Sequence, residues 1–248
     1  MKAQLIDGKQ ISAEIKAEAA EEAAALKAKG ITPCLAVVLV GDDSASQVYV
    51  NNKKKACEAV GIRSVSHVLS GETTEEALLE LIAKLNADKD IHGILVQMPV
   101  PKQIDERKVI LAIDPKKDVD CFHPVNVGNL HTGGEGFLPC TPAGIIELIK
   151  RSGHSIEGKQ CVVIGRSNIV GKPVAMLLMQ ENGTVTICHS KTKNLAEICR
   201  GADIIVSAVG KVNTVTADMV KEGAILIDVG MNRNEAGKLC GDVDFENV

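Results

Sequence analysis

The chain has 248 residues, of which 45% are hydrophobic and 24% are charged, and its formal net charge is −4. This length allows one large domain or two ordinary ones, and the composition excludes a disordered chain. The negative charge argues against a nucleic-acid surface, and the 2% aromatic content without tryptophan leaves no platform for base stacking. The core must therefore be aliphatic, which favours parallel sheets covered by helices.

Targeting signals and metal-binding patterns are not found in the sequence. The N-terminus MKAQLIDGKQ lacks the apolar segment of a signal peptide, and no run of residues reaches membrane-spanning length. The eight cysteines are scattered, with no C-x-x-C pair and no histidine at ligand spacing. We therefore expect a cytoplasmic protein with reduced, mostly buried thiols, with no membrane or nucleic-acid partner and no metal site.

The first half of the chain alternates between helical and strand patterns. An Ala-, Glu- and Lys-rich helix is predicted from about Ile11 to Lys29, and Gly30 follows it as a suitable C-terminal cap. The helix TTEEALLELIAKLN, residues 73–86, begins with a threonine cap and acidic residues in its first turn. The other expected elements are strands at 34–41, 63–69 and 91–101 and a helix at 47–61. This order is typical of a parallel α/β sheet.

A segment of different composition separates the two halves. Residues 114–142 are rich in Pro, Gly, Asp and His, show no clear period and hold two of the three phenylalanines. Structureless segments of this length inside a compact protein are usually functional loops or linkers. We therefore expect this segment to join two domains and to line a cleft.

The second half repeats the alternation without any repeat of fixed period. The expected elements are helices at 143–153, 169–180 and 194–201 and strands at 159–165, 184–190, 202–210 and 223–230. We predict an α/β protein of two domains with a cleft between them. Its parts are an N-terminal domain at 1–120, a connecting segment at 121–142 and a Rossmann-type, doubly wound parallel domain at 143–248.

The stretch QVYVNNKKKACEAVG, residues 47–61, holds the only tyrosine of the chain and three consecutive lysines. On a helix, an apolar stripe is predicted to consist of Ala45, Val48, Ala56, Ala59 and Val60. Tyr49 then lies on the flank of this stripe, and Lys53 stands beside Tyr49 at its edge. A lysine over a partly dry surface can act as an acid or base near neutral pH. The alternative is a solvated basic face with a snorkelling lysine.

The stretch VVIGRSNIVGKP, residues 162–173, is an aliphatic strand that runs into a turn and a helix, as in Rossmann-type dinucleotide sites. Gly165 and Gly171 are present, but Ser167 stands where a second glycine is common, so an ordinary turn is the alternative. The next strand ends in Ser190 and Lys191, and Arg166 follows the first glycine. Because no acidic residue stands where the ribose is bound, this pattern favours NADP over NAD.

Nine segments then follow one another with even spacing. They are YVNNKKKA, GILVQMPVP, KDVDCFHPVN, PCTPAGI, GRSNIVGKP, TICHSKT, ADIIVSAVG, IDVGMN and GDVDF. Together, from about Gly41 to Phe245, they resemble the bifunctional methylenetetrahydrofolate dehydrogenase/cyclohydrolase family. The resemblance implies NADP-dependent oxidation of 5,10-methylenetetrahydrofolate to the methenyl cation, followed by hydrolysis to 10-formyltetrahydrofolate. It also implies a homodimer, formed through the second domain.

The resemblance assigns roles to residues of the first domain. Lys53 matches the catalytic acid and base, and Gln97 matches the glutamine that holds it, although a strand-end amide bound to backbone is the alternative. Tyr49 matches the aromatic residue that packs on the folate. Asp120 matches the carboxylate that binds the pterin N–H donors, with an Asx turn as the alternative. The predicted substrate-binding residues are Tyr49, Lys53, Val96, Gln97, Met98 and Asp120.

In the second domain the resemblance implies cofactor contacts from the phosphate turn and the following strand ends. The predicted residues are Gly165, Arg166, Ser167, Ser190 and, through its backbone, Met231.

Two features depart from the family pattern. Cys121 stands where many members have glycine, which predicts a buried spectator thiol or a change in the pterin pocket. Family members also continue past GDVDFENV with a folate-lining loop and a last helix, and we expect this tail to be absent from the printed sequence rather than from the protein. The remaining alternatives are another two-domain NADP oxidoreductase, similar to shikimate dehydrogenase, and a non-catalytic protein on the same scaffold.

Overall fold

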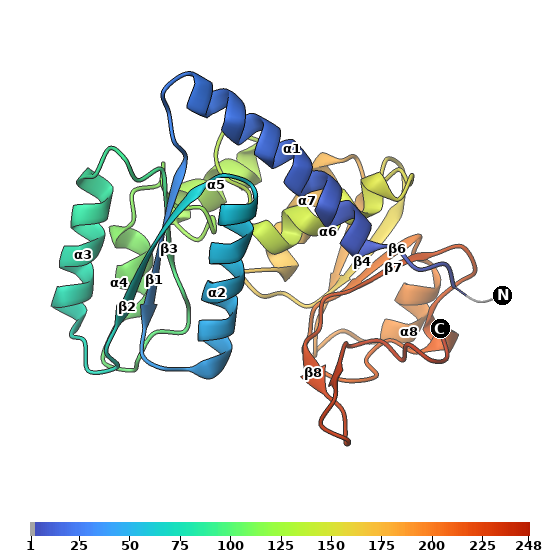
Figure 1. Ribbon diagram of the computed structural model, residues 1–248. Coiled ribbons are helices and arrows are strands. Elements are labelled where there is room, and N and C mark those ends of the chain that lie inside the picture. Colours follow the sequence, from blue (N-terminus) through green and yellow to red (C-terminus); the bar gives the residue numbers. More distant parts are fainter. Residues whose placement is uncertain (1–2) are drawn as a thin grey trace. The chain divides into compact units, whose positions relative to one another are not determined.

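The computed structural model describes residues 3–248, without the side chains of residues 44 and 45. The chain forms two compact units, one at Lys9–Leu138 and one at Pro139–Val248 that also includes the described residues before Lys9. Each unit contains a parallel sheet with helices packed on it, so the predicted two-domain α/β class is confirmed (Figure 1). The predicted cleft concerns the relation of the two units and stays a prediction. Among the described residues, no helix combines the length and apolarity needed to cross a membrane.

The first unit carries helices and strands in alternation. Its elements are α1 (Gly8–Ala28), β1 (Cys34–Val40), α2 (Ser44–Ala59), β2 (Arg63–Leu69), α3 (Glu75–Ala87), β3 (Gly93–Val96), α4 (Glu106–Ala112) and α5 (Pro124–Thr132). The predicted helices and strands of this half are present, and α4 and α5 are additional. The third strand ends at Val96, earlier than predicted, before two prolines that cannot donate ladder hydrogen bonds.

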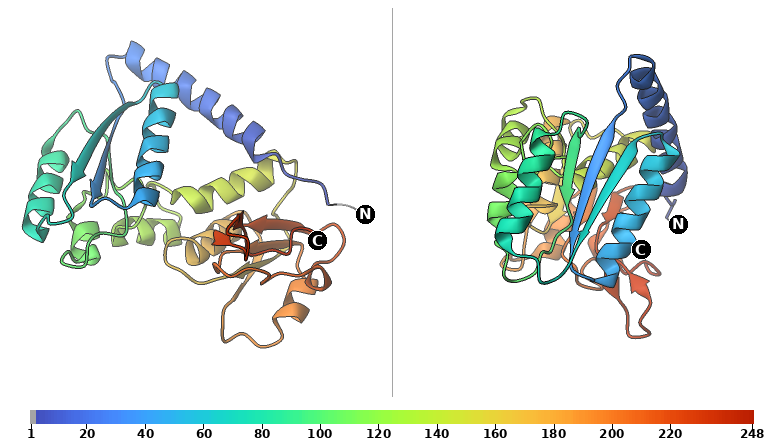
Figure 2. Two further views of the ribbon diagram at one scale, coloured as in Figure 1. Left: turned by 60° about the horizontal axis from the view of Figure 1, so that its bottom comes forward. Right: turned by 60° about the vertical axis from the view of Figure 1, so that its left-hand side comes forward.

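The first sheet has the order β2-β1-β3, and its strands are parallel (Figure 2, right). β1 reads as a continuous aliphatic run because it is covered on both faces. Val38 enters a core that also contains Ile82 of α3 and Val109 of α4. Its neighbour Val37 points to the opposite face and packs in a cluster with Val50 of α2. The sheet therefore holds α2 on the face opposite α3 and α4.

The expectation that residues 114–142 lack structure was wrong. Helix α5 lies inside this segment, and the next helix begins at Cys140. The Nδ1 of His123 accepts a hydrogen bond from the amide of Val125 and caps α5, Pro124 occupies its first turn, and Gly133 ends it in the left-handed region. A helix of nine residues shows too few turns for a period to be visible in the sequence.

The second unit is a Rossmann-type domain. Its elements are α6 (Cys140–Arg151), β4 (Gln160–Ile164), α7 (Gly171–Gln180), β5 (Thr184–Cys188), α8 (Leu195–Arg200), β6 (Ile204–Ser207), a 3-10 turn η1 (Ala217–Met219), β7 (Ile225–Asp228), β8 (Asn232–Arg233) and β9 (Leu239–Cys240). The main sheet is parallel with the order β5-β4-β6-β7, and β8 and β9 form a short antiparallel hairpin. The order reverses beside β4, which is the point where such sheets bind ligands.

Candidate active site

The inward face of α2 is not the stripe that the sequence predicted. Val48 is 58% exposed, and Ala59 is also exposed. Among the described side chains of α2 and its C-terminal cap, the buried ones are Ser46, Val50, Cys57 and Val60. Val60 thus agrees with the predicted stripe, and the side chain of Ala45 lies outside the description. The buried positions repeat at helical spacing, and Lys53 falls between Val50 and Cys57 on the same face. Lys53 therefore lies on the middle of the inward face rather than at its edge, and its side chain is half-buried.

Lys53 contacts Gln97, the pair that the family resemblance implies. The Lys53 Nζ donates a hydrogen bond of 3.1 Å to the Oε1 of Gln97. The Gln97 Nε2 donates to the carbonyl of Met98 at 2.9 Å, and its backbone amide donates to the carbonyl of Val38 at 2.8 Å. Because the amide nitrogen is already committed, the amide oxygen is fixed toward the lysine. The structure thus contains a half-buried amine whose position is set by a neutral acceptor.

Asp118 anchors the loop that carries Asp120, and the sequence analysis missed it. Its carboxylate is buried and accepts hydrogen bonds from the amide of His123 at 2.8 Å and from the Asn126 Nδ2 at 2.9 Å. Asp118 also forms a parallel bridge with Ile94, which places this loop beside β3. A buried carboxylate requires such donors, but the motif D-x-D alone does not reveal which aspartate receives them.

Asp120 occupies a different environment from Asp118. Burial raises the pKa of the Asp120 carboxyl; the nearby Lys53 cation lowers it, and the Asp118 carboxylate raises it further. No hydrogen bond from the described residues contributes to this pKa. The carboxylate therefore lies near Lys53 in a partly desolvated environment, and it can accept hydrogen bonds from N–H groups of a bound molecule.

The other predicted substrate-binding residues differ in how much of their surface is exposed to solvent. Tyr49 is 44% exposed, one helical turn before Lys53. Met98 is half-buried and packs against the core of the first sheet. Val96 belongs to that core with 4% of its surface exposed, so it offers almost no surface to a ligand.

The turn after β4 requires both of its glycines. Gly165 has φ of +122°, and a Cβ there would overlap the carbonyl oxygen of Ala208. A Cβ on Gly171 would overlap the carbonyl oxygen of Gly165. The turn, the exit of β6 and the start of α7 therefore approach one another closely at the edge where dinucleotide phosphates bind in such folds.

Ser167 replaces the common second glycine by closing the turn itself. Its Oγ accepts hydrogen bonds from the amides of Val170 at 3.1 Å and Gly171 at 3.2 Å. These bonds cap the N-terminus of α7. The hydroxyl oxygen is thus occupied, and its proton remains available to donate to an anion.

The strand ends around this turn fit NADP. Arg166 and Ser190 are exposed, and the turn after β5 is closed by a hydrogen bond from the amide of Lys191 to the Nδ1 of His189. No acidic residue stands between His189 and Lys193 to repel a 2′-phosphate. Met231 is 66% exposed after β7.

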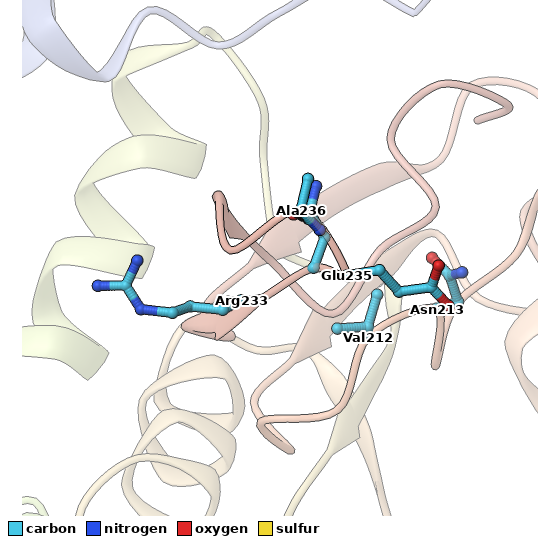
Figure 3. A pocket seen from close by; sticks show the side chains of 6 residues that line it. Val212, Asn213, Arg233, Glu235 and Ala236 are labelled. Atoms are coloured by element: carbon cyan, nitrogen blue, oxygen red, sulfur yellow. Dashed lines mark hydrogen bonds between the residues drawn. The ribbon is translucent and has the colours of Figure 1, made fainter.

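The other features considered as functional sites are a metal cluster, the cysteines and a surface depression. Within residues 3–248 no group of three His, Cys, Asp or Glu is placed to hold a metal ion. The eight cysteines are all reduced thiols, and six of them are buried, as predicted for most. A depression of about 540 Å³ beside the hairpin shares no residue with the predicted site (Figure 3). Its lining residues are Val212, Asn213, Arg233, Asn234, Glu235 and Ala236.

The fold and these groups define a two-domain, dinucleotide-binding protein with a lysine–amide pair in its first domain. Two family descriptions match the chain: tetrahydrofolate dehydrogenase/cyclohydrolase, catalytic domain, at residues 6–120, and the NAD(P)-binding domain of the same family at residues 139–248. The chain therefore belongs to the tetrahydrofolate dehydrogenase/cyclohydrolase family, as its motifs predicted.

Individual relatives agree with this assignment. A bifunctional protein FolD from Agathobacter rectalis is 61% identical over 246 residues, which cover 99% of this chain and 88% of the relative. The crystal structure of a bifunctional FolD enzyme from Campylobacter jejuni superposes with a TM-score of 0.96 and 53% identity, and covers 99% of this chain and 87% of that one. The crystal structure of a methylenetetrahydrofolate dehydrogenase-cyclohydrolase (FolD) from Trypanosoma brucei, solved with NADP and an inhibitor, superposes with a TM-score of 0.92 and 41% identity. The match covers 99% of this chain and 87% of that one. A shikimate 5-dehydrogenase from Thermus thermophilus shares the fold alone, with 16% identity.

Proposed function

We propose that this chain carries out both reactions of its family, with Lys53 and Gln97 at the centre of the active site. It oxidises 5,10-methylenetetrahydrofolate to the 5,10-methenyl cation with NADP, and it hydrolyses that cation to 10-formyltetrahydrofolate. The observation that carries the residue assignment is the hydrogen bond between Lys53 and Gln97 in a half-buried position.

The oxidation depends on alignment. Bound NADP⁺ supplies the hydride acceptor. Gly165 lets the backbone approach its phosphates, Arg166 and Ser190 bind the 2′-phosphate, and the backbone of Met231 holds the nicotinamide end. Asp120 accepts the N–H donors of the pterin ring, and Tyr49 packs on the ring, so that the reacting carbon is held in place.

The hydrolysis depends on proton transfer by Lys53. Its amine takes a proton as water adds to the electron-poor methenyl carbon. The resulting ammonium delivers a proton to the ring nitrogen whose bond to that carbon breaks, and the second proton of the water leaves to solvent. Gln97 keeps the Nζ in place without adding a negative charge, so the amine can change its protonation state during the reaction.

We propose a homodimer that acts on tetrahydrofolate derivatives in the cytoplasm. The support for the location is the set of reduced thiols, which is typical of proteins from a reducing compartment.

The test is an assay of the purified chain that follows NADPH and the methenyl species together. The unsubstituted chain is expected to form NADPH without lasting methenyl. Lys53→Met, which keeps the length of the side chain, is expected to lose hydrolysis of supplied methenyltetrahydrofolate, whereas Lys55→Met on the exposed side of α2 retains it. Hydrolysis at the unsubstituted rate in Lys53→Met would remove the assigned role of Lys53.

A further inference from the structure

Asp242 is a buried carboxylate that the reaction described above does not use. The residue has no exposed surface. Its two oxygens accept hydrogen bonds from five donors: the Ser207 Oγ at 3.1 Å, the amides of Val209 at 2.8 Å, Gly210 at 3.3 Å and Lys211 at 2.9 Å, and the Asn232 Nδ2 at 2.9 Å. Burial would raise the pKa of this carboxyl, but these hydrogen bonds outweigh burial and hold its pKa below the usual value.

A second carboxylate holds Asp242 in place. Asp228, at the end of β7, accepts a hydrogen bond from the amide of Asp242 at 2.8 Å and another from the amide of Gly230 at 3.1 Å. A Cβ on Gly230 would overlap the Asp242 carboxylate, and a Cβ on Gly241 would overlap the Asp228 carboxylate. The two aspartates and the two glycines therefore interlock the exits of β6 and β7 with the segment that follows the hairpin.

The segments held in this way border the candidate cofactor site. Residues 209–211 follow the exit of β6, where the carbonyl oxygen of Ala208 lies against Gly165. Met231 lies between Gly230 and Asn232, both of which contact one of the two aspartates. Dinucleotides bind across this edge of a Rossmann-type sheet. Val209 and Met231 are 42% and 66% exposed, although a carboxylate binds the amide of Val209 and carboxylates also bind the residues on both sides of Met231.

We propose that Asp242 is a positioning residue for the cofactor: it fixes the backbone of residues 209–211 and, through Asn232, that of Met231, so that both form a rigid wall for the nicotinamide half of NADP. This inference rests on the proposed function. Asp242 touches neither substrate nor cofactor in this role, and its effect passes through the amides that it binds. Preorganised backbone lowers the ordering cost of binding, so the proposal concerns affinity as well as rate.

The direct test is Asp242→Asn. Each carboxylate oxygen accepts from at least two N–H or O–H donors, so either orientation of the asparagine places its NH₂ group against other donors. The KM for NADP is expected to rise about tenfold or more, while hydrolysis of supplied methenyltetrahydrofolate stays within about twofold. Asp244→Asn is the matched control because the Asp244 side chain accepts from the Asn247 Nδ2 instead of from these amides, and it is expected to leave both values unchanged.

A second readout needs no turnover. Without cofactor, the amides of residues 209–211 are expected to exchange hydrogen at least about tenfold faster in Asp242→Asn than in the unsubstituted chain. Asn232→Ala, which removes one donor and leaves the carboxylate, is expected to raise the KM for NADP by roughly threefold to tenfold. This variant keeps the inference testable where Asp242→Asn does not fold.

The outcomes separate three cases. A purely structural role would lower kcat through loss of folded enzyme and leave the KM of the remaining enzyme unchanged, which would contradict the inference. Unchanged KM and unchanged exchange in Asp242→Asn would contradict it as well. Absence of both activities from the unsubstituted chain would instead overturn the proposed function.

Discussion

The side-chain nitrogen of Lys53 and the side-chain oxygen of Gln97 lie 3.1 Å apart although 44 positions separate them in the chain. The contact joins α2 to the residue directly after β3, on the sheet face opposite α3 and α4. A neutral amide at this point positions the amine without adding a second charge beside it.

Gln97→Glu is expected to slow hydrolysis at neutral pH and to move its pH profile upward by about one unit or more. A carboxylate beside Lys53 favours the ammonium form, so the unprotonated amine is reached only at higher pH. The measurement is the rate of methenyltetrahydrofolate hydrolysis between neutral and alkaline pH. Gln97→Met, which removes the acceptor without adding charge, is expected to lose rate at every pH. An identical profile for Gln97→Glu and the unsubstituted chain would show that the two side chains do not act together.

Asp120→Asn is expected to stabilise the fold at neutral pH while raising the KM for folate about tenfold or more. The pKa of Asp120 is raised in the folded state, mainly by burial, so the folded chain holds this proton more tightly than the unfolded chain. Stability is then lost as the pH rises from the unfolded pKa through the folded one. An amide avoids this loss.

Melting temperatures measured at several pH values test the effect of burying the Asp120 carboxyl. The melting temperature of Asp120→Asn is expected to exceed that of the unsubstituted chain at pH 7, and the difference to narrow toward pH 4. Asp118→Asn is the contrasting variant, because its carboxylate is buried with donors, and it is expected to melt lower at pH 7. Equal melting temperatures for Asp120→Asn and the unsubstituted chain at all pH values would contradict the burial argument.

Arg166→Ala is expected to weaken NADP binding about 10- to 100-fold and NAD binding less than about threefold. The guanidinium follows the phosphate turn, and only NADP offers a 2′-phosphate for it to bind. Titration calorimetry with the two nucleotides measures the difference. Arg200→Ala on α8, whose side chain donates to the carbonyl of Asp218, serves as a control and is expected to change neither affinity. Equal losses for both nucleotides would remove the 2′-phosphate assignment.

Gly165→Ala is expected to lower the free energy of unfolding by about 2 kcal/mol or more and to abolish NADP binding. The new Cβ would overlap the carbonyl oxygen of Ala208, and the φ of +122° strains any other residue. Gly144→Ala, inside α6 with open space around it, is expected to gain about 0.5–1 kcal/mol. Denaturant unfolding of both variants gives the comparison, and a stable, NADP-binding Gly165→Ala would contradict the described turn.

The fold was largely predictable because its strands are aliphatic runs. The strands predicted at 34–41 and 159–165 appear at Cys34–Val40 and Gln160–Ile164, since continuous burial leaves only one type of residue suitable. The strand orders could not be read in this way, because they depend on which buried faces meet in space. Helix α5 was missed because its capping residues, rather than a period, define it.

The site residues that belong to sequence motifs were predictable. The residues whose environment depends on packing in three dimensions were not. The motifs selected Lys53 and Gln97, and the structure joins them. The apolar stripe on α2 was placed wrongly because Val48 is exposed while the polar Ser46 is buried, so residue polarity alone gives the wrong phase. The segment GDVDF was recognised as a family motif, but the contacts of Asp242 could not be predicted from it, because most of its partners are backbone amides more than thirty positions away.

The position of Tyr49 has an optical consequence. The chain contains no tryptophan and one tyrosine, and this phenol stands half-exposed one turn before Lys53. Intrinsic ultraviolet emission therefore comes almost entirely from a single ring in the candidate active site. A change in that emission reports what happens beside Lys53 without an attached label.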